Sequence, residues 1–246
     1  MNFKNLDKLK SKLDKYRPLD NTIVQNLRED LILRWTYNSN AIEGNTLTLN
    51  ETKVALEGIT VGGKTIREHF EAINHKEAIE FIETMVKKDE ILSEYSIKSL
   101  HYLILKNIDN KNAGSYRDIN VLISGAKHRP PINIEVPSKM ENFIDWYKTD
   151  AQKLHTIERA CRIHIDFVSI HPFSDGNGRT SRLLMNFELM KNGFPPIVLK
   201  VENRLEYYEA LDEAHTSNNY KPFIKLISSL VEDSFEPYWF VLGMSI

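Results

Sequence analysis

Residues 171–182 have the sequence HPFSDGNGRTSR, and this short segment carries more structural information than any other part of the chain. It follows a stretch with helical periodicity, and Pro172 disfavours helical geometry in the residue before it, so a helix should end at His171. The glycines on either side of Asn177 permit a tight loop, and a second helix is predicted over 177–192. The segment therefore predicts a helix, a loop and a helix in immediate succession.

The loop and the second helix together predict an anion-binding site. The first N–H groups of that helix and the positive end of its dipole face the loop. Arg179 and Arg182 lie three residues apart and so share one helix face, and their planar guanidinium groups suit phosphate oxygens. With His171 as a proton acceptor and Asp175 as a carboxylate, the segment is typical of a site for Mg²⁺ and a polyphosphate.

Three other interpretations fit the segment less well. A calcium-binding EF-hand loop would need oxygen ligands at its first and twelfth positions, where this sequence has Phe173 and Leu184. A Walker phosphate loop would need lysine where Arg179 stands, and it would follow a strand rather than a helix. A structural histidine beside a helix cap and solvated arginines accounts for His171 alone, but not for the whole group.

The same segment resembles the signature of the Fic (filamentation-induced by cAMP) family, H-P-F-x-[D/E]-G-N-G-R-x-x-R, and matches it at every fixed position. Residues 114–131, which include Gly114-Ser115-Tyr116-Arg117 and Pro130-Pro131, are similar to the flap hairpin of that family. Residues 204–211 resemble the helix after its catalytic core. The resemblance covers about residues 20–232 and implies an all-α Fic fold, a helical bundle with one β-hairpin flap.

The resemblance also implies an activity, the transfer of AMP from ATP to a Ser, Thr or Tyr hydroxyl of a target protein. His171 would be the general base, because a reference pKa of about 6.5 leaves imidazole largely neutral at pH 7. Asp175 would hold Mg²⁺, the expected cofactor, on the ATP phosphates. The residues expected to bind the nucleotide are Asp175, Gly176, Asn177, Gly178, Arg179, Thr180, Ser181, Arg182 and Tyr207.

Separate tasks are implied within that set. Residues 176–178 would form the hole for the α-phosphate, where charge develops during transfer. Arg179 would steady the phosphate chain and Arg182 the γ-phosphate, while Tyr207 falls where family members contact adenine. His215 departs from the family pattern, because close relatives have asparagine there, and this leaves the second base contact open.

Residues 114–136 differ from the rest of the chain in their pattern. The apolar triplet 121–123 and the segment Ile132-Asn133-Ile134 flank a glycine and a Pro-Pro pair, which predicts two short strands around a loop. In the family, the edge of such a flap would pair with the backbone of the target and position its hydroxyl. The residues expected to dock the target are Ile123, Ser124, Gly125 and Ala126.

A second motif lies far upstream. Ser39, Glu43 and Gly44 match the inhibitory pattern of the family, [S/T]-x-x-x-E-[G/N]. Taken alone, the pattern is equally typical of a capping serine and a surface glutamate. Beside residues 171–182, it predicts that Glu43 reaches Arg182 across the nucleotide pocket and inhibits the enzyme, in the class whose inhibitory helix precedes the core.

The predicted function is therefore a protein adenylyltransferase autoinhibited by Glu43. One alternative is a de-AMPylase that uses the same site, with Glu43 aligning the water. Another is a nucleotide-binding module without transferase activity, against which the intact His171 argues, because a scaffold needs no base. The last alternative is a toxin component restrained by a separate antitoxin. The motif at Ser39 and Glu43 makes such a separate inhibitor less necessary.

The length of 246 residues fits one large domain, with 41% hydrophobic residues to form its core. We expect N-terminal helices with the inhibitory motif in 1–50, the Fic core in 51–232 and a C-terminal tail in 233–246. Helices are predicted over 3–16, 21–37, 51–58, 65–87, 93–107, 138–149, 155–170, 177–192, 203–215 and 220–232, with a short helical signal at 39–43.

The composition argues against some classes of binding partner. A net charge of −2 argues against nucleic acid as the main partner, and no segment approaches the roughly 20 apolar residues of a membrane helix. The single cysteine, Cys161, excludes a disulfide within the chain and permits the cytoplasmic location that we expect. The expected partners are ATP and a target protein with an exposed hydroxyl group, and a homodimer is left open.

Overall fold

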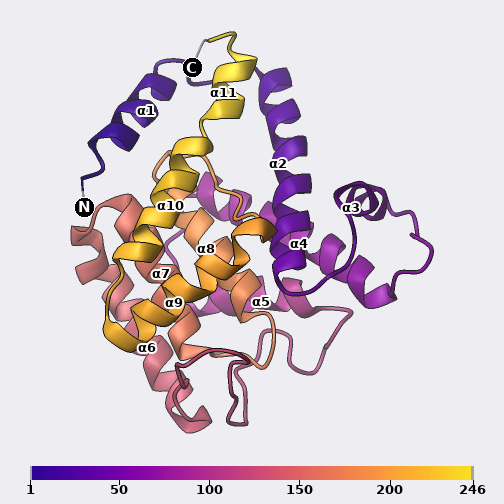
Figure 1. The fold of residues 1–246 in the computed structure, drawn as a ribbon, viewed down its shortest axis with the longest axis vertical. Coiled ribbons are helices and arrows are strands. Elements are labelled where there is room, and N and C mark those ends of the chain that lie inside the picture. The colour runs from indigo at the N-terminus through magenta and orange to yellow at the C-terminus, as the bar shows by residue number, and fades with distance from the viewer. Residues whose placement is uncertain (1, 245–246) are drawn as a thin grey trace.

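The computed structural model describes residues 2–244, which form helices joined by loops (Figure 1). No strand occurs within these residues, so the all-α prediction is confirmed. The α-helices are α1 (Lys4–Asp14), α2 (Asn21–Ile42), α3 (Leu49–Leu56), α4 (Ile66–Lys87), α5 (Glu94–Leu105), α6 (Val136–Lys148), α7 (Thr156–Ile170), α8 (Asn177–Lys191), α9 (Arg204–Ser217), α10 (Lys221–Asp233) and α11 (Glu236–Val241). Short 3-10 helices cover Asn133–Glu135, Asp150–Lys153 and Val201–Asn203.

The helices α7 and α8 form the centre of the fold and pack against each other extensively. Twelve of the fifteen residues of α8 are buried, so this helix has no solvent-facing side of the kind that a surface helix has. Two apolar clusters meet on the pair: one joins it to α1, α9, α10 and α11, the other to α2, α4, α5 and α6. The segment between α7 and α8 is thus held by the most buried part of the molecule.

Helix α2 is longer than the sequence predicts. The stretch after residue 37 looked turn-rich because it is polar, yet α2 continues without a break to Ile42. Its polar side chains have tertiary partners: the Asn38 side chain accepts a hydrogen bond from the Val201 N–H (3.0 Å), and that of Asn40 donates to the Glu71 carbonyl (3.1 Å). These contacts stabilise a helix that local propensity alone does not favour.

The β-hairpin predicted over 114–136 is wrong, because no strands form and pair in this segment. The segment crosses the surface as an irregular loop, and the side chain of Arg117 replaces the missing ladder bonds. Arg117 donates to the carbonyls of Ile119 (2.9 Å) and Pro131 (2.5 Å), one in each arm of the loop. Pro130 and Pro131 have no N–H group to donate, which further removes ladder hydrogen bonds.

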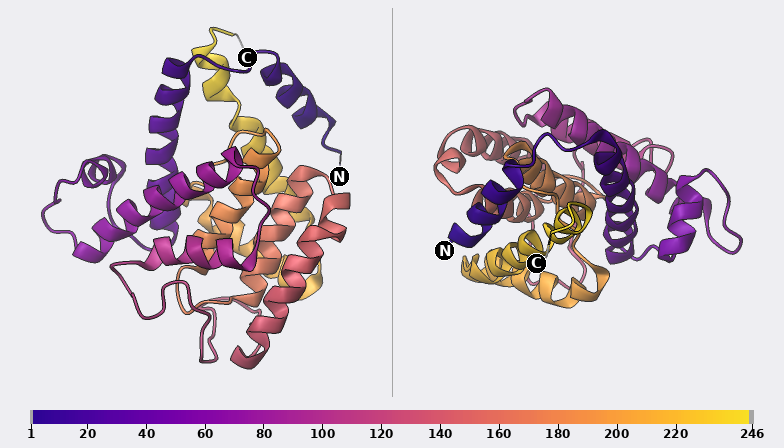
Figure 2. Two further views of the ribbon diagram at one scale, coloured as in Figure 1. Left: turned by 180° about the vertical axis from the view of Figure 1, so that it is seen from behind. Right: turned by 90° about the horizontal axis from the view of Figure 1, so that it is seen from above.

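The C-terminal tail packs on the core in part. Trp239 is buried, whereas Phe240 is 75% exposed and lines a groove of about 760 Å³ between α11 and α2. In Figure 2, α11 and the start of α2 lie at the same end of the molecule as α1. Met1, Ser245 and Ile246 lie outside the described residues, so the end of the predicted tail is not covered. No helix within residues 2–244 is long and apolar enough to cross a membrane.

Candidate active site

His171 stands at the C-terminal end of α7, as Pro172 predicts. Its backbone adopts the left-handed conformation (φ 50°), and its N–H donates to the Phe167 carbonyl at 3.0 Å. Burial lowers the pKa of the imidazole to about 4, so His171 is neutral near pH 7. Its Nδ1 atom is buried without a partner among residues 2–244, which leaves Nε2 to exchange a proton with a bound molecule.

The loop after His171 is fixed by its own side chains. Asn177 accepts a hydrogen bond from the Phe173 N–H (3.0 Å) and donates one to the Phe173 carbonyl (2.7 Å). Phe173 is fully buried and so anchors the loop to the core. The side chain of Asn177 therefore shapes the loop, and only its backbone is left for the predicted phosphate hole.

His101 on α5 is a positioning residue that sequence reasoning missed. Its ring stacks on Phe173, with centroids 3.5 Å apart and the planes within 2°. Its Nε2 lies 2.9 Å from the Asp175 carbonyl, and its Nδ1 lies 3.0 Å from the Gly114 nitrogen. A carbonyl only accepts and an N–H only donates, so His101 carries its proton on Nε2, and burial keeps it neutral by lowering its pKa to about 4.

The start of α8 has the geometry of an anion cradle. Gly176 precedes the helix with φ 78°, and no side chain caps the N-terminus. A Cβ atom at Gly178 would collide with Oε1 of Glu43, so the absence of a side chain is what lets the carboxylate approach. Glu43 thus places a negative charge where the helix dipole and free N–H groups favour one.

Arg182 joins the inhibitory motif to α8. It is buried, and its guanidinium group donates to Oε1 of Glu43 (2.7 Å), to the Ser39 hydroxyl (3.1 Å) and to the Ser39 carbonyl (2.8 Å). The contact expected between Glu43 and Arg182 is therefore present. The Nη1 atom of Arg182 has no partner among residues 2–244, so it retains a hydrogen bond to give.

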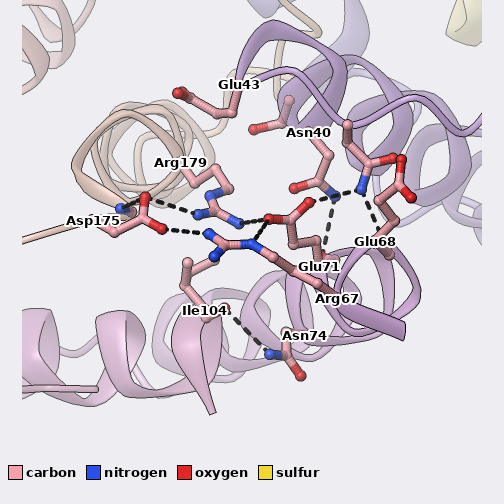
Figure 3. Close-up of polar contacts among 12 residues, drawn as sticks. Asn40, Glu43, Arg67, Glu68, Glu71, Asn74, Ile104, Asp175 and Arg179 are labelled. Carbon is pink, nitrogen blue, oxygen red and sulfur yellow. Dashed lines mark hydrogen bonds and ion pairs between the residues drawn. The ribbon is translucent and has the colours of Figure 1, made fainter. Parts of the chain in front are cut away.

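Asp175 and Arg179 belong to a charged network with α4 (Figure 3). Asp175 accepts from Arg179 (3.3 Å) and from Arg67 (2.7 Å), and Glu71 pairs with both arginines. Burial alone would raise the pKa of Asp175, but Arg179, the Gly176 N–H and Arg67 outweigh it and hold that pKa below its usual value. Arg67 and Glu71 were not predicted, because nothing in their local sequence points toward residues that follow a hundred positions later.

A magnesium ion fits this site only together with the nucleotide. No group of three or more potential metal ligands occurs among residues 2–244. Asp175 offers one carboxylate, which is 45% exposed. Magnesium in nucleotide sites is commonly held by one or two carboxylates and by the phosphates, and one accessible carboxylate beside an anion cradle meets that need.

The remaining predicted nucleotide residues turn toward the core. Ser181 donates to the Gly178 carbonyl (2.8 Å), and Thr180 is fully buried. Tyr207 is 1% exposed, and its hydroxyl lies 3.0 Å from Nε2 of His164. Its contact with adenine remains a prediction, and the adjacent Tyr208, 40% exposed, is a second aromatic candidate.

The predicted docking residues 123–126 form the turn of the flap. The Ala126 N–H donates to the Ile123 carbonyl (3.2 Å), and Gly125 has φ 79°. Beyond the turn, His128 Nε2 lies 2.9 Å from the Ser169 carbonyl on α7, and its ring centroid is 4.7 Å from that of His215. The flap is thus attached close to His171, although its docking role stays a prediction.

Comparison with known proteins agrees with this arrangement. The model of the Fic/DOC family matches residues 91–189. A solved Fic domain containing signaling protein from Bacteroides thetaiotaomicron is 32% identical with a TM-score of 0.89, over 98% of this chain and 99% of that one. The chain belongs to the Fic family. Fic-1 from Caenorhabditis elegans (residues 134–508) is also 32% identical, with a TM-score of 0.88 over 98% of this chain and 72% of that one.

Curated Fic relatives carry the name of an activity. "Protein adenylyltransferase Fic" of Nematostella vectensis is 37% identical over 238 residues, which are 95% of this chain and 55% of that protein. "Protein adenylyltransferase fic-1" of C. elegans is 35% identical over 88% of this chain and 43% of its own length. The chain spans about half the length of the curated relatives it matches.

Proposed function

We propose that the chain is a protein adenylyltransferase that Glu43 inhibits. The observation that carries the proposal is the neutral imidazole of His171 beside an uncapped helix N-terminus, with one rigid loop between them. The names of the Fic relatives support the same activity. ATP and a target protein would be its substrates, and a cytoplasmic location and the division into 1–50, 51–232 and 233–246 remain part of the proposal.

The proposed reaction uses these groups in order. A target hydroxyl oxygen attacks the α-phosphorus of ATP, its proton passes to Nε2 of His171, and the bond to the bridging oxygen breaks, so pyrophosphate leaves. Backbone N–H groups at the start of α8 stabilise the charge that develops on the α-phosphate. Bound magnesium, held by Asp175 and the phosphates, would neutralise the phosphate charge during transfer. Arg179 and Arg182 orient the remaining phosphates.

Inhibition follows from the same geometry. While Arg182 donates to Glu43, the carboxylate occupies the cradle and repels a triphosphate. A nucleotide that still binds has its phosphates displaced, and small misplacement of a reacting centre lowers rates by orders of magnitude. Removing the carboxylate should free both Arg182 and the cradle.

A second candidate function is removal of AMP from a modified protein. The Glu43 carboxylate is 35% exposed and lies at the same site, so it could align a water molecule for attack on a phosphodiester. In this case loss of Glu43 would abolish AMP removal, whereas in the inhibited transferase it would raise AMP transfer.

Incubation with α-labelled ATP and cell lysate tests the proposal. Glu43→Gly should raise labelling, including self-modification, by about tenfold or more, since each tenfold step needs about 1.4 kcal/mol. Glu43→Gly combined with Arg182→Ala should fall back toward the parent, because the released arginine is needed. A single variant no more active than the parent would show that Glu43 does not inhibit, and release of AMP from the labelled product by the parent alone would identify the reverse reaction.

A further inference from the structure

Arg67 on α4 occupies a position that the Fic signature does not explain. Its Nη2 atom donates to Oδ2 of Asp175 at 2.7 Å, and its Nε atom donates to Oε1 of Glu71 at 3.1 Å. Figure 3 shows the guanidinium group between the two carboxylates, where it bridges α4 to the loop before α8. The ion pair joins residues 108 positions apart, so it is a tertiary contact and not a local helix pair.

The other oxygen of Asp175 is also engaged. Oδ1 accepts from the Gly176 N–H (2.6 Å) and from Nη2 of Arg179 (3.3 Å). A divalent cation binds a carboxylate through the same lone pairs that accept these hydrogen bonds. Oδ2 accepts from Arg67 and keeps one further lone pair, so a cation that binds this oxygen, as the proposed function requires, stands against the positive charge of the guanidinium group already there.

The two arginines differ in how readily they can leave. Arg179 is 2% exposed and is enclosed between Asp175 and Glu71, whereas the side chain of Arg67 is 57% exposed. Water can replace the hydrogen bonds of an exposed guanidinium group, and exposed ion pairs contribute little to stability. Arg67 is thus the partner that exchanges, and its separate bond to Glu71 keeps it beside the site after exchange.

We infer that Arg67 is a positioning residue that holds Asp175 in the absence of metal and is displaced from it by the divalent cation. The inference rests on the proposed function for the need of a metal and a nucleotide. Arg67 keeps the carboxylate oriented in the empty site, and it lowers the affinity of Asp175 for metal because the cation competes with an existing pair. The metal dependence of nucleotide binding is therefore set in part by a residue on α4, outside the signature segment.

The test measures how strongly metal tightens nucleotide binding, with no reaction involved. The full chain is titrated with a non-hydrolysable ATP analogue by calorimetry, once in EDTA and once in Mg²⁺. The dissociation constant in EDTA is divided by that in Mg²⁺, and this ratio is compared between the parent and each variant. Arg67→Gln should increase this ratio by about two- to five-fold, the size of an exposed ion pair. Arg34→Gln is the matched control, because Arg34 is 56% exposed and pairs with Asp30 on α2, and it should leave the ratio unchanged.

Each other outcome has a defined meaning. A ratio that stays the same or falls in Arg67→Gln overturns the inference, because a structural role would weaken both titrations equally and an assisting role would lower the ratio. If the parent binds no nucleotide at all, the proposed function fails, and Mn²⁺ alone, followed by electron paramagnetic resonance, decides the inference. Tighter Mn²⁺ binding by Arg67→Gln than by the parent supports it, and equal binding overturns it.

Discussion

The loop 171–177 and the flap 114–136 are both irregular, and both adjoin His171, yet they are held in different ways. The loop is fixed from within, since Asn177 forms two hydrogen bonds to the backbone of Phe173. The flap is fixed mainly through side chains: Arg117 donates to the His171 carbonyl (2.8 Å) and to both arms of the flap, and His128 Nε2 lies 2.9 Å from the Ser169 carbonyl. At the turn of the flap, Ser124 and Gly125 are exposed.

The difference shows where precision is needed. The proposed chemistry at His171 would depend on geometry within a fraction of an ångström, which short-range bonds between neighbouring residues can supply. The proposed docking of a target would tolerate more adjustment, and the flap is attached to the core through a few separate contacts of Arg117, Lys127 and His128. Four measurements test this contrast, from the largest expected effect to the smallest.

Replacing the base should have the largest effect. In the Glu43→Gly background, His171→Ala should lower AMP transfer by about 10²–10⁴-fold, the typical contribution of a general base, while ATP affinity measured by calorimetry changes little. His128→Ala in the flap is the comparison and should cost far less. Loss of ATP affinity together with activity in His171→Ala would assign this residue to binding instead.

Removing the flap anchor should lower stability. Arg117→Met keeps the apolar stem but leaves three carbonyls without their donor, which should reduce the free energy of unfolding by about 2 kcal/mol. Urea denaturation measures the change, and Arg129→Met, an exposed position in the same segment, is the control. Equal stability of the two variants would mean that the flap does not depend on Arg117.

Acid should lower the stability of the fold, because several of its histidines are buried in the neutral form. Burial lowers the pKa of His101 and His171 to about 4, and it also lowers the pKa of His75, His164 and His215. Each folded-state pKa lies below the unfolded value near 6.5, so the unfolded chain binds more protons, and stability falls as the pH drops below 6.5.

For each histidine, the folding equilibrium constant should fall by at most about tenfold for each pH unit. Thermal denaturation at pH 7.5 and 5.5 should give a lower midpoint at pH 5.5, and His101→Gln should reduce the difference. A midpoint that is the same or higher at pH 5.5 would contradict the neutral state of these histidines.

The flap backbone should show the smallest effect. Ile123→Pro removes an N–H donor from the docking turn and should raise the KM for the target roughly five-fold, the value of about one hydrogen bond, without altering ATP affinity. Ile123→Ala keeps the N–H and separates backbone from side-chain effects. Normal modification of the target by Ile123→Pro would show that the target is held elsewhere.

The same contrast explains which features the sequence could predict. The end of α7 at His171 and the start of α8 follow from neighbouring residues, and both are present. The strands of the flap were predicted wrongly because Arg117 satisfies the carbonyls that a ladder would have used.

Features that depend on distant contacts were missed for a related reason. Arg67, Glu71 and His101 lie on helices whose patterns indicate ordinary packing, and only the fold brings them to the loop. Tyr207 is buried in the core, and its expected contact with adenine stays a prediction. A short signature locates the chemistry, but the residues that adjust it are scattered along the chain.

The double hydrogen bond of Asn177 also bears on the chemical ageing of the protein. An asparagine followed by glycine is prone to deamidation, which begins when the nitrogen of the next residue attacks the side-chain amide carbon. Here Phe173 engages both ends of that amide, and Asn177 is 2% exposed in the first turn of α8, so the attack geometry is blocked. An aspartate at this position could not donate to the Phe173 carbonyl, so a chain that unfolds and deamidates would lose a hydrogen bond that fixes the loop after His171. Folding thus protects the covalent structure of the site as well as its shape.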